Sequence, residues 1–378
     1  MKRIGKALIL AGVLLFLGIM ISMIGIGYLI GDNRSSRNSG TTAQDSDGNI
    51  QYETKTYVID AADLQQVKVD LTVEDIRIEP TDDDQITIEY KDIVDHPRYE
   101  VKSADGTLRI GHTNTGISGQ MILVPPVLTK DNFQFGGNGQ ELEHGDIKIR
   151  IPENYMGDYD LSVTSGSVSM EDIHVSGNIK CGLTSGEARV SNVTGEKGMQ
   201  VSMTSGDFRA DTLSLEDNLD INSTSGDSNL TAVTLGGNLH TDVTSGDFHA
   251  DTLSLKGNLD INSTSGDSDL TDATLGGDLY TDVTSGRFSA DQLTVSGLMK
   301  MNTTSGNINI KKLTLGNAIE VDGTSGSVTV SLTDAMEQYT IAVDTVSGSC
   351  NLPNSYTGGT KKISVDTVSG NIDFRFEE

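Results

Sequence analysis

One tripeptide that recurs at a fixed interval constrains this fold more than any other feature of the chain. Thr-Ser-Gly occurs nine times, always twenty residues apart, with its threonines at Thr164, Thr184, Thr204, Thr224, Thr244, Thr264, Thr284, Thr304 and Thr324. Val346-Ser347-Gly348 and Val368-Ser369-Gly370 continue the series at a spacing of 22. A fixed period of about twenty residues is typical of a solenoid, in which each turn buries its apolar face only by stacking on its neighbours.

Apolar residues alternate with polar ones around each Thr-Ser-Gly, which is the period of a β-strand. The alternation runs through Leu219 and Ile221 before the tripeptide and returns at Ser228 and Leu230, then at Val233 and Leu235. Turn-forming residues such as Ser-Gly-Asp and Gly-Gly-Asn separate the three segments. The sequence therefore predicts an all-β fold, a three-sided parallel β-solenoid with turns of about twenty residues.

A second period of forty residues indicates close packing between successive turns. Residues 201–240 and 241–280 match at 29 of 40 positions. The alternation pairs large with small: Phe208 and Ala210 are followed one turn later by Ser228 and Leu230. We expect these residues to stack directly on one another, because a dense core needs complementary volumes. If the strands lie about 4.8 Å apart, eleven Ser-Gly marks make a rod on the order of 50 Å long.

The N-terminal region predicts a membrane anchor. Residues 1–6 carry three basic side chains, and the next 24 residues, 7–30, are uncharged. A helix of that length spans about 36 Å, enough to cross the hydrocarbon core of a bilayer. The alternative is a cleaved signal peptide, but the segment shows no clear small-residue cleavage site. The basic residues favour a cytoplasmic N-terminus, so we expect a single-pass protein of the cell membrane with its C-terminal domain outside the cytoplasm.

The remaining chain divides into three parts. Residues 31–52 are polar and predict a flexible linker. Residues 53–160 alternate like strands without the strict repeat, and the segment 71–78 resembles a degenerate repeat, so we expect an N-terminal β module that covers the first edge of the stack. It contains one irregular insertion, 114–145. Residues 161–378 form the predicted solenoid, and we expect 371–378 to close its core and carry charge at the open edge.

Three segments carry a resemblance to a known family. They are Val67-Lys68-Val69-Asp70-Leu71-Thr72-Val73-Glu74-Asp75-Ile76, Gly145-Asp146-Ile147-Lys148-Ile149-Arg150-Ile151-Pro152 and Ile363-Ser364-Val365-Asp366-Thr367-Val368-Ser369-Gly370. Together they resemble the bacterial putative-adhesin, domain-of-unknown-function family with β-strand repeats, which includes LiaG-like envelope proteins. The resemblance covers residues 55–378. It implies a surface or envelope role and supplies no catalytic residues.

The residue after each Ser-Gly is the main candidate for chemistry. Four of these residues, Asp207, Asp227, Asp247 and Asp267, would align about 4.8 Å apart in a stack. They could bind Ca²⁺ between turns through carboxylate and carbonyl oxygens. The alternative, which we favour, is that each solvated Asp hydrogen-bonds its own turn. We further expect hydroxyl ladders between stacked Thr and Ser, and amide-to-acid hydrogen bonds between Asn222 and Asp242 and their equivalents.

The charge and the distribution of the residues argue against some classes of function. The formal net charge of -27 makes nucleic acid an unfavourable partner. The six histidines are scattered and the acids are spread evenly, so we expect no catalysis and no cofactor other than the candidate calcium. The sequence favours an extracytoplasmic binding or spacer element whose partner is a cell-wall or host-surface glycan or a protein. Two alternatives remain open: an envelope-stress sensor or scaffold, and a carbohydrate-active β-helix enzyme.

Overall fold

The computed structural model describes residues 51–94, 97–113 and 145–377, which form strands and two short 3-10 helices. The N-terminal part contains β1 (Tyr52–Asp60), η1 (Ala61–Asp63), β2 (Gln66–Leu71), β3 (Asp75–Thr81), β4 (Gln85–Ile93), β5 (Tyr99–Ala104), β6 (Thr107–His112) and β7 (Asp146–Pro152). The regular turns contain β8 (Asp158–Glu171), β9 (His174–Val175), β10 (Ile179–Gly195), β11 (Met199–Leu215), β12 (Leu219–Ser225), β13 (Ser228–Leu235), β14 (Leu239–Ser245), β15 (Phe248–Leu255), β16 (Leu259–Ser265), β17 (Ser268–Leu275), β18 (Leu279–Ala290), β19 (Leu293–Val295), β20 (Leu298–Leu315), β21 (Ala318–Ser325) and β22 (Val328–Leu332). The last part contains η2 (Met336–Gln338), β23 (Tyr339–Ser347), β24 (Ser355–Tyr356), β25 (Lys361–Ser369) and β26 (Ile372–Phe376).

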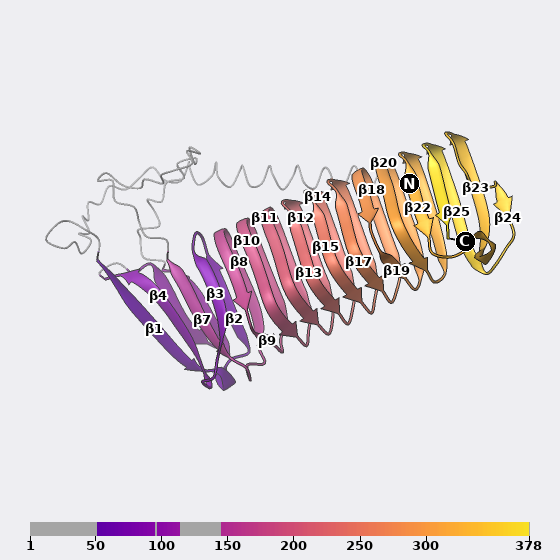
Figure 1. The fold of residues 1–378 in the computed structure, drawn as a ribbon. Helices are drawn as coiled ribbons and strands as arrows, with labels where there is room; N and C mark the ends of the chain where they lie inside the picture. Colours follow the sequence, from indigo (N-terminus) through magenta and orange to yellow (C-terminus); the bar gives the residue numbers. More distant parts are fainter. Residues whose placement is uncertain (1–50, 95–96, 114–144, 378) are drawn as a thin grey trace, which may run out of the picture. The chain divides into compact units, whose positions relative to one another are not determined.

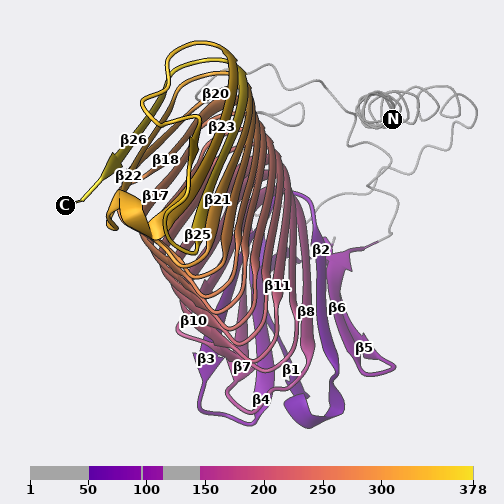
Figure 2. The same ribbon diagram turned by 90° about the vertical axis from the view of Figure 1, so that its right-hand side faces the viewer.

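Each regular turn pairs in parallel with the next turn, twenty residues further along the chain. Ile221 pairs with Thr241, which pairs with Ile261, and the same offset holds from β8 to β22 except for one irregularity near Leu313. Figures 1 and 2 show the strands of successive turns lying side by side. The predicted parallel β-solenoid with turns of twenty residues is confirmed.

The interior follows the predicted volume alternation. Phe208 pairs with Ser228, and Ser228 pairs in turn with Phe248. All three side chains are at most 1% exposed. In the same strands Ala210 pairs with Leu230, so a large residue lies against a small one in both columns. Stacking in register therefore keeps the volume of each layer nearly constant, because the two alternations are out of phase.

Two of the corners depend on backbone conformations that most residues avoid. The glycine of the tripeptide has a positive φ in most turns, for example +139° at Gly246. A Cβ at Gly246 would lie 2.2 Å from the carbonyl oxygen of Gly226 in the preceding turn. At the second corner Asn192, Thr212 and Ala232 are left-handed, with φ of 52–58°. The prediction of a turn that tolerates a left-handed backbone is confirmed at the Ser-Gly corner, whereas no residue of the Gly236-Gly237-Asn238 corner has a positive φ. The β-branched Thr212 is strained in its left-handed conformation.

The stack begins earlier in the chain than the first Thr-Ser-Gly. β2 and β3 both pair in parallel with β8, through Val69–Leu161 and Ile76–Val168. The degenerate turn predicted at residues 71–78 is therefore a turn of the solenoid. On its outer side β6 pairs with β2 and β7 pairs with β3, and the antiparallel strands β4 and β1 follow β7. The insertion predicted at 114–145 lies outside the described residues except for Gly145.

At the other end the turns do not stack in chain order. β25 pairs with β21 on one side and with β23 on the other, and β26 pairs with β22. Figure 1 shows β25 beside β23 at the end of the stack. The prediction that residues 371–378 form the outermost turn is wrong, because the earlier segment that contains β23 and β24 lies outside them. The sequence could not show this order, because residues 341–348 and 363–370 are identical at seven of eight positions.

In the described ranges, no helix has the length and apolar character needed to cross a bilayer. The predicted anchor at 7–30, the N-terminal residues 1–6 and most of the linker at 31–52 lie outside these ranges. The anchor therefore stays a prediction from the sequence.

Candidate functional site

The four aspartates singled out from the sequence form a row of hydrogen-bond acceptors between turns. The Oδ1 atoms of Asp207, Asp227 and Asp247 each accept the backbone N–H of the residue one turn later, at 2.8–3.0 Å. Asp267 does the same for Arg287 at 2.9 Å. Asp75 begins the series by accepting the N–H of Ser167. Each aspartate thus bonds the following turn, and the expectation that it bonds its own turn is wrong.

This arrangement satisfies a backbone donor that the sheet leaves open at the corner, which is a structural task. The third corner of the turn, at Asn218 and its equivalents, has the same kind of hydrogen bond. Asn218 accepts the N–H of Asn238, and Asn238 accepts that of Asn258, both at 2.7 Å. Neutral amides therefore do at one corner what carboxylates do at the other. The negative charge of the aspartates is not needed for the hydrogen bond itself.

Calcium binding at this row stays a prediction. Across residues 51–94, 97–113 and 145–377, no group of three or more His, Cys, Asp or Glu side chains is arranged to hold a metal ion. Arg287 also forms an ion pair with Asp267, at 3.0 Å, at one end of the row. The Oδ2 atoms of these aspartates form one column along the stack.

The Thr and Ser of the tripeptide form two columns of hydroxyls on one side of the solenoid. All are exposed or half-buried. Within the described part of the chain, none of the nine Thr hydroxyls and none of the nine Ser hydroxyls has a hydrogen-bond partner. The prediction of hydroxyl ladders between turns is therefore wrong. We call the Thr and Ser columns of the tripeptide the hydroxyl face. The predicted inter-turn bonds of the Asn222 column are also wrong, since Asn262 instead donates to Asp260 of its own strand at 3.3 Å.

The fold itself does not need these hydroxyls. Val368 takes the place of Thr324 in the next turn of the stack, since Ser325 pairs with Ser369. Val346 takes the same place one turn further out. Valine keeps the branched shape that suits a strand but has no hydroxyl, and both turns keep the register. The hydroxyl is therefore dispensable for stacking.

The neighbouring exposed column changes its residue from turn to turn, whereas the hydroxyl face does not. The position two residues before each Thr is occupied by Ser162, Gly182, Ser202, Asn222, Asp242, Asn262, Asp282, Asn302 and Asp322. The Thr and Ser stay the same in all nine turns. Strand propensity accounts for a β-branched residue but does not select Thr over Val. An invariant, exposed and unpartnered hydroxyl is the feature expected of a contact surface.

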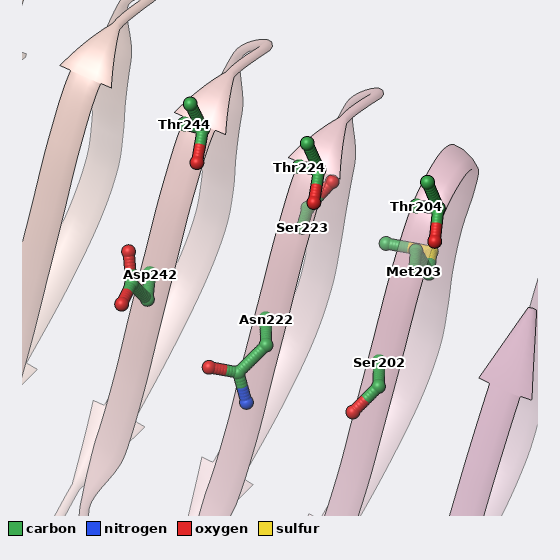
Figure 3. A pocket seen from close by; sticks show the side chains of 8 residues that line it. All are labelled: Ser202, Met203, Thr204, Asn222, Ser223, Thr224, Asp242 and Thr244. Carbon is green, nitrogen blue, oxygen red and sulfur yellow. The ribbon is translucent and has the colours of Figure 1, made fainter. Parts of the chain in front are cut away.

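A groove of ≈ 270 Å³ lies on this face over β11, β12 and β14. Its lining includes Thr204, Thr224 and Thr244, and beside them Asn222 and Asp242. Figure 3 shows the three threonines in a row with their hydroxyls pointing the same way, and Ser202, Asn222 and Asp242 in a second row. The groove presents both donors and acceptors at the repeat of the turns.

The family model Toastrack DUF4097 matches residues 64–278 and 278–375. The chain belongs to the toastrack DUF4097 family. The match covers the first turn, the regular repeats and the exchanged turns at the end, so the resemblance seen in the sequence is confirmed. A comparison with curated proteins found no match to this chain.

Solved structures of similar proteins come from three bacteria. A putative cell adhesion protein from Clostridium sporogenes is 10% identical with a TM-score of 0.18, and the alignment covers 86% of this chain and 100% of that one. A putative adhesin from Bacteroides fragilis is 14% identical with a TM-score of 0.23, over 85% and 97% of the two chains. A putative adhesin from Parabacteroides distasonis is 14% identical with a TM-score of 0.26, over 73% and 96%.

The toastrack chain also holds a buried polar cluster that the sequence reasoning missed. Glu74 stands where later turns have the glycine of the tripeptide, and its side chain is 3% exposed. Its carboxylate accepts the N–H groups of Thr72 and Val73 at 3.0 and 2.9 Å and the hydroxyl of Tyr99 at 3.1 Å. His112 lies 3.5 Å from the same carboxylate. The sequence carries one sign of this cluster, which is a Glu at the position of the repeated Gly.

Burial alone would raise the pKa of Glu74, but the contacts outweigh it. The hydrogen bond from His112, those from Val73 and Thr72, and the charge of His112 lower the pKa of Glu74 to about 2. The hydrogen bond to Glu74 raises the pKa of His112 above 6.5 against the opposing effect of burial. Burial and then the charge of Glu74 raise the pKa of Tyr99. The cluster therefore joins the first turn to β5 and β6 through a carboxylate that stays ionised.

Replacing Asp227 separates the structural role of the row from a calcium site. We expect Asp227→Asn to leave thermal stability unchanged or slightly raised, because the amide oxygen keeps the hydrogen bond and one repulsive charge is removed. Asp227→Ala should lower stability by about 1 kcal/mol. Thermal unfolding with Ca²⁺ and with EDTA provides the measurement. A stabilisation by Ca²⁺ that Asp227→Asn abolishes would instead identify the row as a calcium site.

His112 should make the N-terminal module sensitive to pH. Because its folded pKa is raised above 6.5, its contribution to stability is complete below that pH and is lost as pH rises through the folded pKa. His112→Gln should therefore lower the melting temperature more at pH 5.5 than at pH 8.5. His174→Gln is the control, since the His174–Glu196 pair is exposed and contributes less than about 1 kcal/mol. Equal losses for His112→Gln at both pH values would contradict the ion pair.

Proposed function

We propose that this protein is a membrane-anchored, extracytoplasmic β-solenoid of the bacterial envelope that binds a surface polymer without catalysing a reaction. The hydroxyl face is the binding surface. The single observation that carries the proposal is that eighteen hydroxyls in nine turns are unpartnered within the described chain, although two turns show that the stack forms without the Thr hydroxyl.

The chemistry of the face favours an uncharged, hydroxyl-rich polymer such as a cell-wall or host glycan. Thr and Ser hydroxyls both donate and accept, which suits the hydroxyl and amide groups of a polysaccharide. The column beside them contains Asp242, Asp282 and Asp322, and the net charge is -27. A polyanion would be repelled by this surface. A polymer that runs along the stack would meet the same pair of hydroxyls at every turn, so that many weak contacts add together.

The anchor at 7–30 and the linker at 31–52 fit this role. A span with a cytoplasmic N-terminus would place the turns outside the membrane, and a polar linker of 22 residues would let them reach a polymer in the wall. A scaffold or stress sensor would use the same anchor but would not need invariant hydroxyls. A carbohydrate-active enzyme would release soluble sugar from the polymer that it binds.

Removing hydroxyls from the face should weaken polymer binding while the fold is kept. The full chain in detergent micelles is mixed with insoluble peptidoglycan or chitin, and the sedimented fraction is measured. The triple variant Thr224→Val, Thr244→Val and Thr264→Val should bind at least about tenfold more weakly, since three hydrogen bonds of about 0.5–1.5 kcal/mol each are lost. Its melting temperature should stay within a few degrees of the parent.

The matched control changes three threonines on another side of the solenoid, in the turns of Thr224, Thr264 and Thr284. Thr234, Thr274 and Thr294 point outward from β13, β17 and β19. Their replacement by Val should leave binding unchanged. Equal losses in both triple variants, or no binding of the parent to either polymer, would contradict the proposal. Release of soluble sugar that depends on the protein would support the enzyme alternative instead.

A further inference from the structure

The exchanged order at the end of the stack creates a slot that is filled by a later part of the chain. We define the terminal slot as the layer between β21–β22 and β23 that β25 and β26 occupy. The hydrogen bonds follow this order: Val328 N–H donates to Asn371 O at 2.8 Å, and Ile372 N–H donates to Ser349 O at 2.8 Å. The glycine column follows it as well, because a Cβ at Gly370 would meet Gly326 and one at Gly348 would meet Gly370. The segment that fills the slot is therefore paired on both sides.

Two segments of the chain fit the same slot. Ile341-Ala342-Val343-Asp344-Thr345-Val346-Ser347-Gly348 and Ile363-Ser364-Val365-Asp366-Thr367-Val368-Ser369-Gly370 are identical at seven of eight positions. If β25 and β26 left the slot, β23 could stack on β21 in ordinary chain order with almost the same contacts. The free-energy difference between the two strand orders is therefore small compared with the cost of leaving a strand unpaired. The inserted segment can therefore be exchanged.

The contacts that favour the inserted order lie at the ends of the segment. The Lys361 ammonium lies 2.6 Å from the Asp334 carboxylate, and both side chains are about a quarter exposed. The Asn351 side chain donates to Asp373 at 2.9 Å and accepts the N–H of Phe374 at 2.9 Å. The connection between β23 and β25 contains the two-residue strand β24, which pairs with Ile341 and Ala342, and Asn354, whose carbonyl accepts the N–H of Val343 at 3.0 Å. Exchange of the inserted segment requires this connection to open, which is a local unfolding step.

We propose that the terminal slot also accepts β25 and β26 from a second copy of this chain, which joins two solenoids end to end by strand exchange. A second copy supplies the required sequence together with the partners of Asp334 and Asn351. It would recreate every contact of the closed form, so the exchange costs only the change in the connection and the loss of free motion of one molecule. The inference does not depend on the ligand of the hydroxyl face.

Disulfide trapping tests the exchange directly. Asp322 of β21 pairs with Asp366 of β25, and all of Asp322, Asp344 and Asp366 are exposed. In a Cys350→Ser background, one tagged full chain carries Asp322→Cys and a second, differently tagged, carries Asp366→Cys. The native Cys181 does not interfere, because burial raises the pKa of its thiol to about 12 and keeps it protonated. The two chains are mixed in detergent micelles at increasing concentration, warmed below the unfolding transition and oxidised.

We expect a disulfide-linked dimer that carries both tags and increases with protein concentration. The control mixture combines Asp322→Cys with Asp344→Cys. The dimer yield should be several-fold higher than in this control, because β25 separates β21 from β23. One chain that carries both Asp322→Cys and Asp366→Cys should form an internal disulfide, which verifies the pairing. The proposal is overturned if that internal bond forms but the mixed chains give no more linked dimer than the control. It is also overturned if a chain with Asp322→Cys and Asp344→Cys links internally instead, since the slot would then not exist.

Discussion

Close contact between the backbones of successive turns at the Ser-Gly corner is the constraint on which the rest of the structure depends. At Gly226, Gly246 and Gly266 a Cβ would lie 1.9–2.2 Å from the glycine carbonyl of the preceding turn. No side chain fits at such a distance, so the glycine is repeated wherever the stack continues. The corner also leaves a backbone N–H without a strand partner. The Asp or Asn that follows the glycine of the preceding turn accepts this N–H. The tight corner thus fixes the register, and the register fixes which core residues meet.

The period of the sequence predicted most of this architecture because each turn is a local copy of the next. The alternation of Phe208 with Ser228 and Phe248 predicts the core correctly, because these residues stack directly on one another. The exchange of the last turns could not be predicted, since β23 and β25 have almost the same sequence and either fits beside β21. The cluster around Glu74 was also missed, because it joins residues from β5, β6 and the first turn that are 25–38 positions apart. Such a cluster has no period.

The candidate site was predicted less well than the fold, and the reason lies in the hydrogen bonds. The sequence drew attention to Asp207, Asp227, Asp247 and Asp267, whose Oδ1 atoms satisfy the backbone of the following turn. It assigned the threonines to ladders within the fold, whereas their hydroxyls have no partner in the described chain. Only the structure distinguishes a hydroxyl that supports the stack from one that faces outward. This difference moves the search for a ligand from the acidic row to the hydroxyl face.

The central claim, that backbone contact at the glycine column holds the turns in register, is tested most directly by adding one methyl group. Gly246→Ala places a Cβ against the Gly226 carbonyl at a φ of +139°, whereas Gly182→Ala places one on an outward strand position with its nearest neighbour 3.9 Å away. Thermal unfolding of both variants compares the same chemical change. We predict a loss of more than about 2 kcal/mol for Gly246→Ala and a change within about 1 kcal/mol for Gly182→Ala. Equal stability of the two variants would contradict the account.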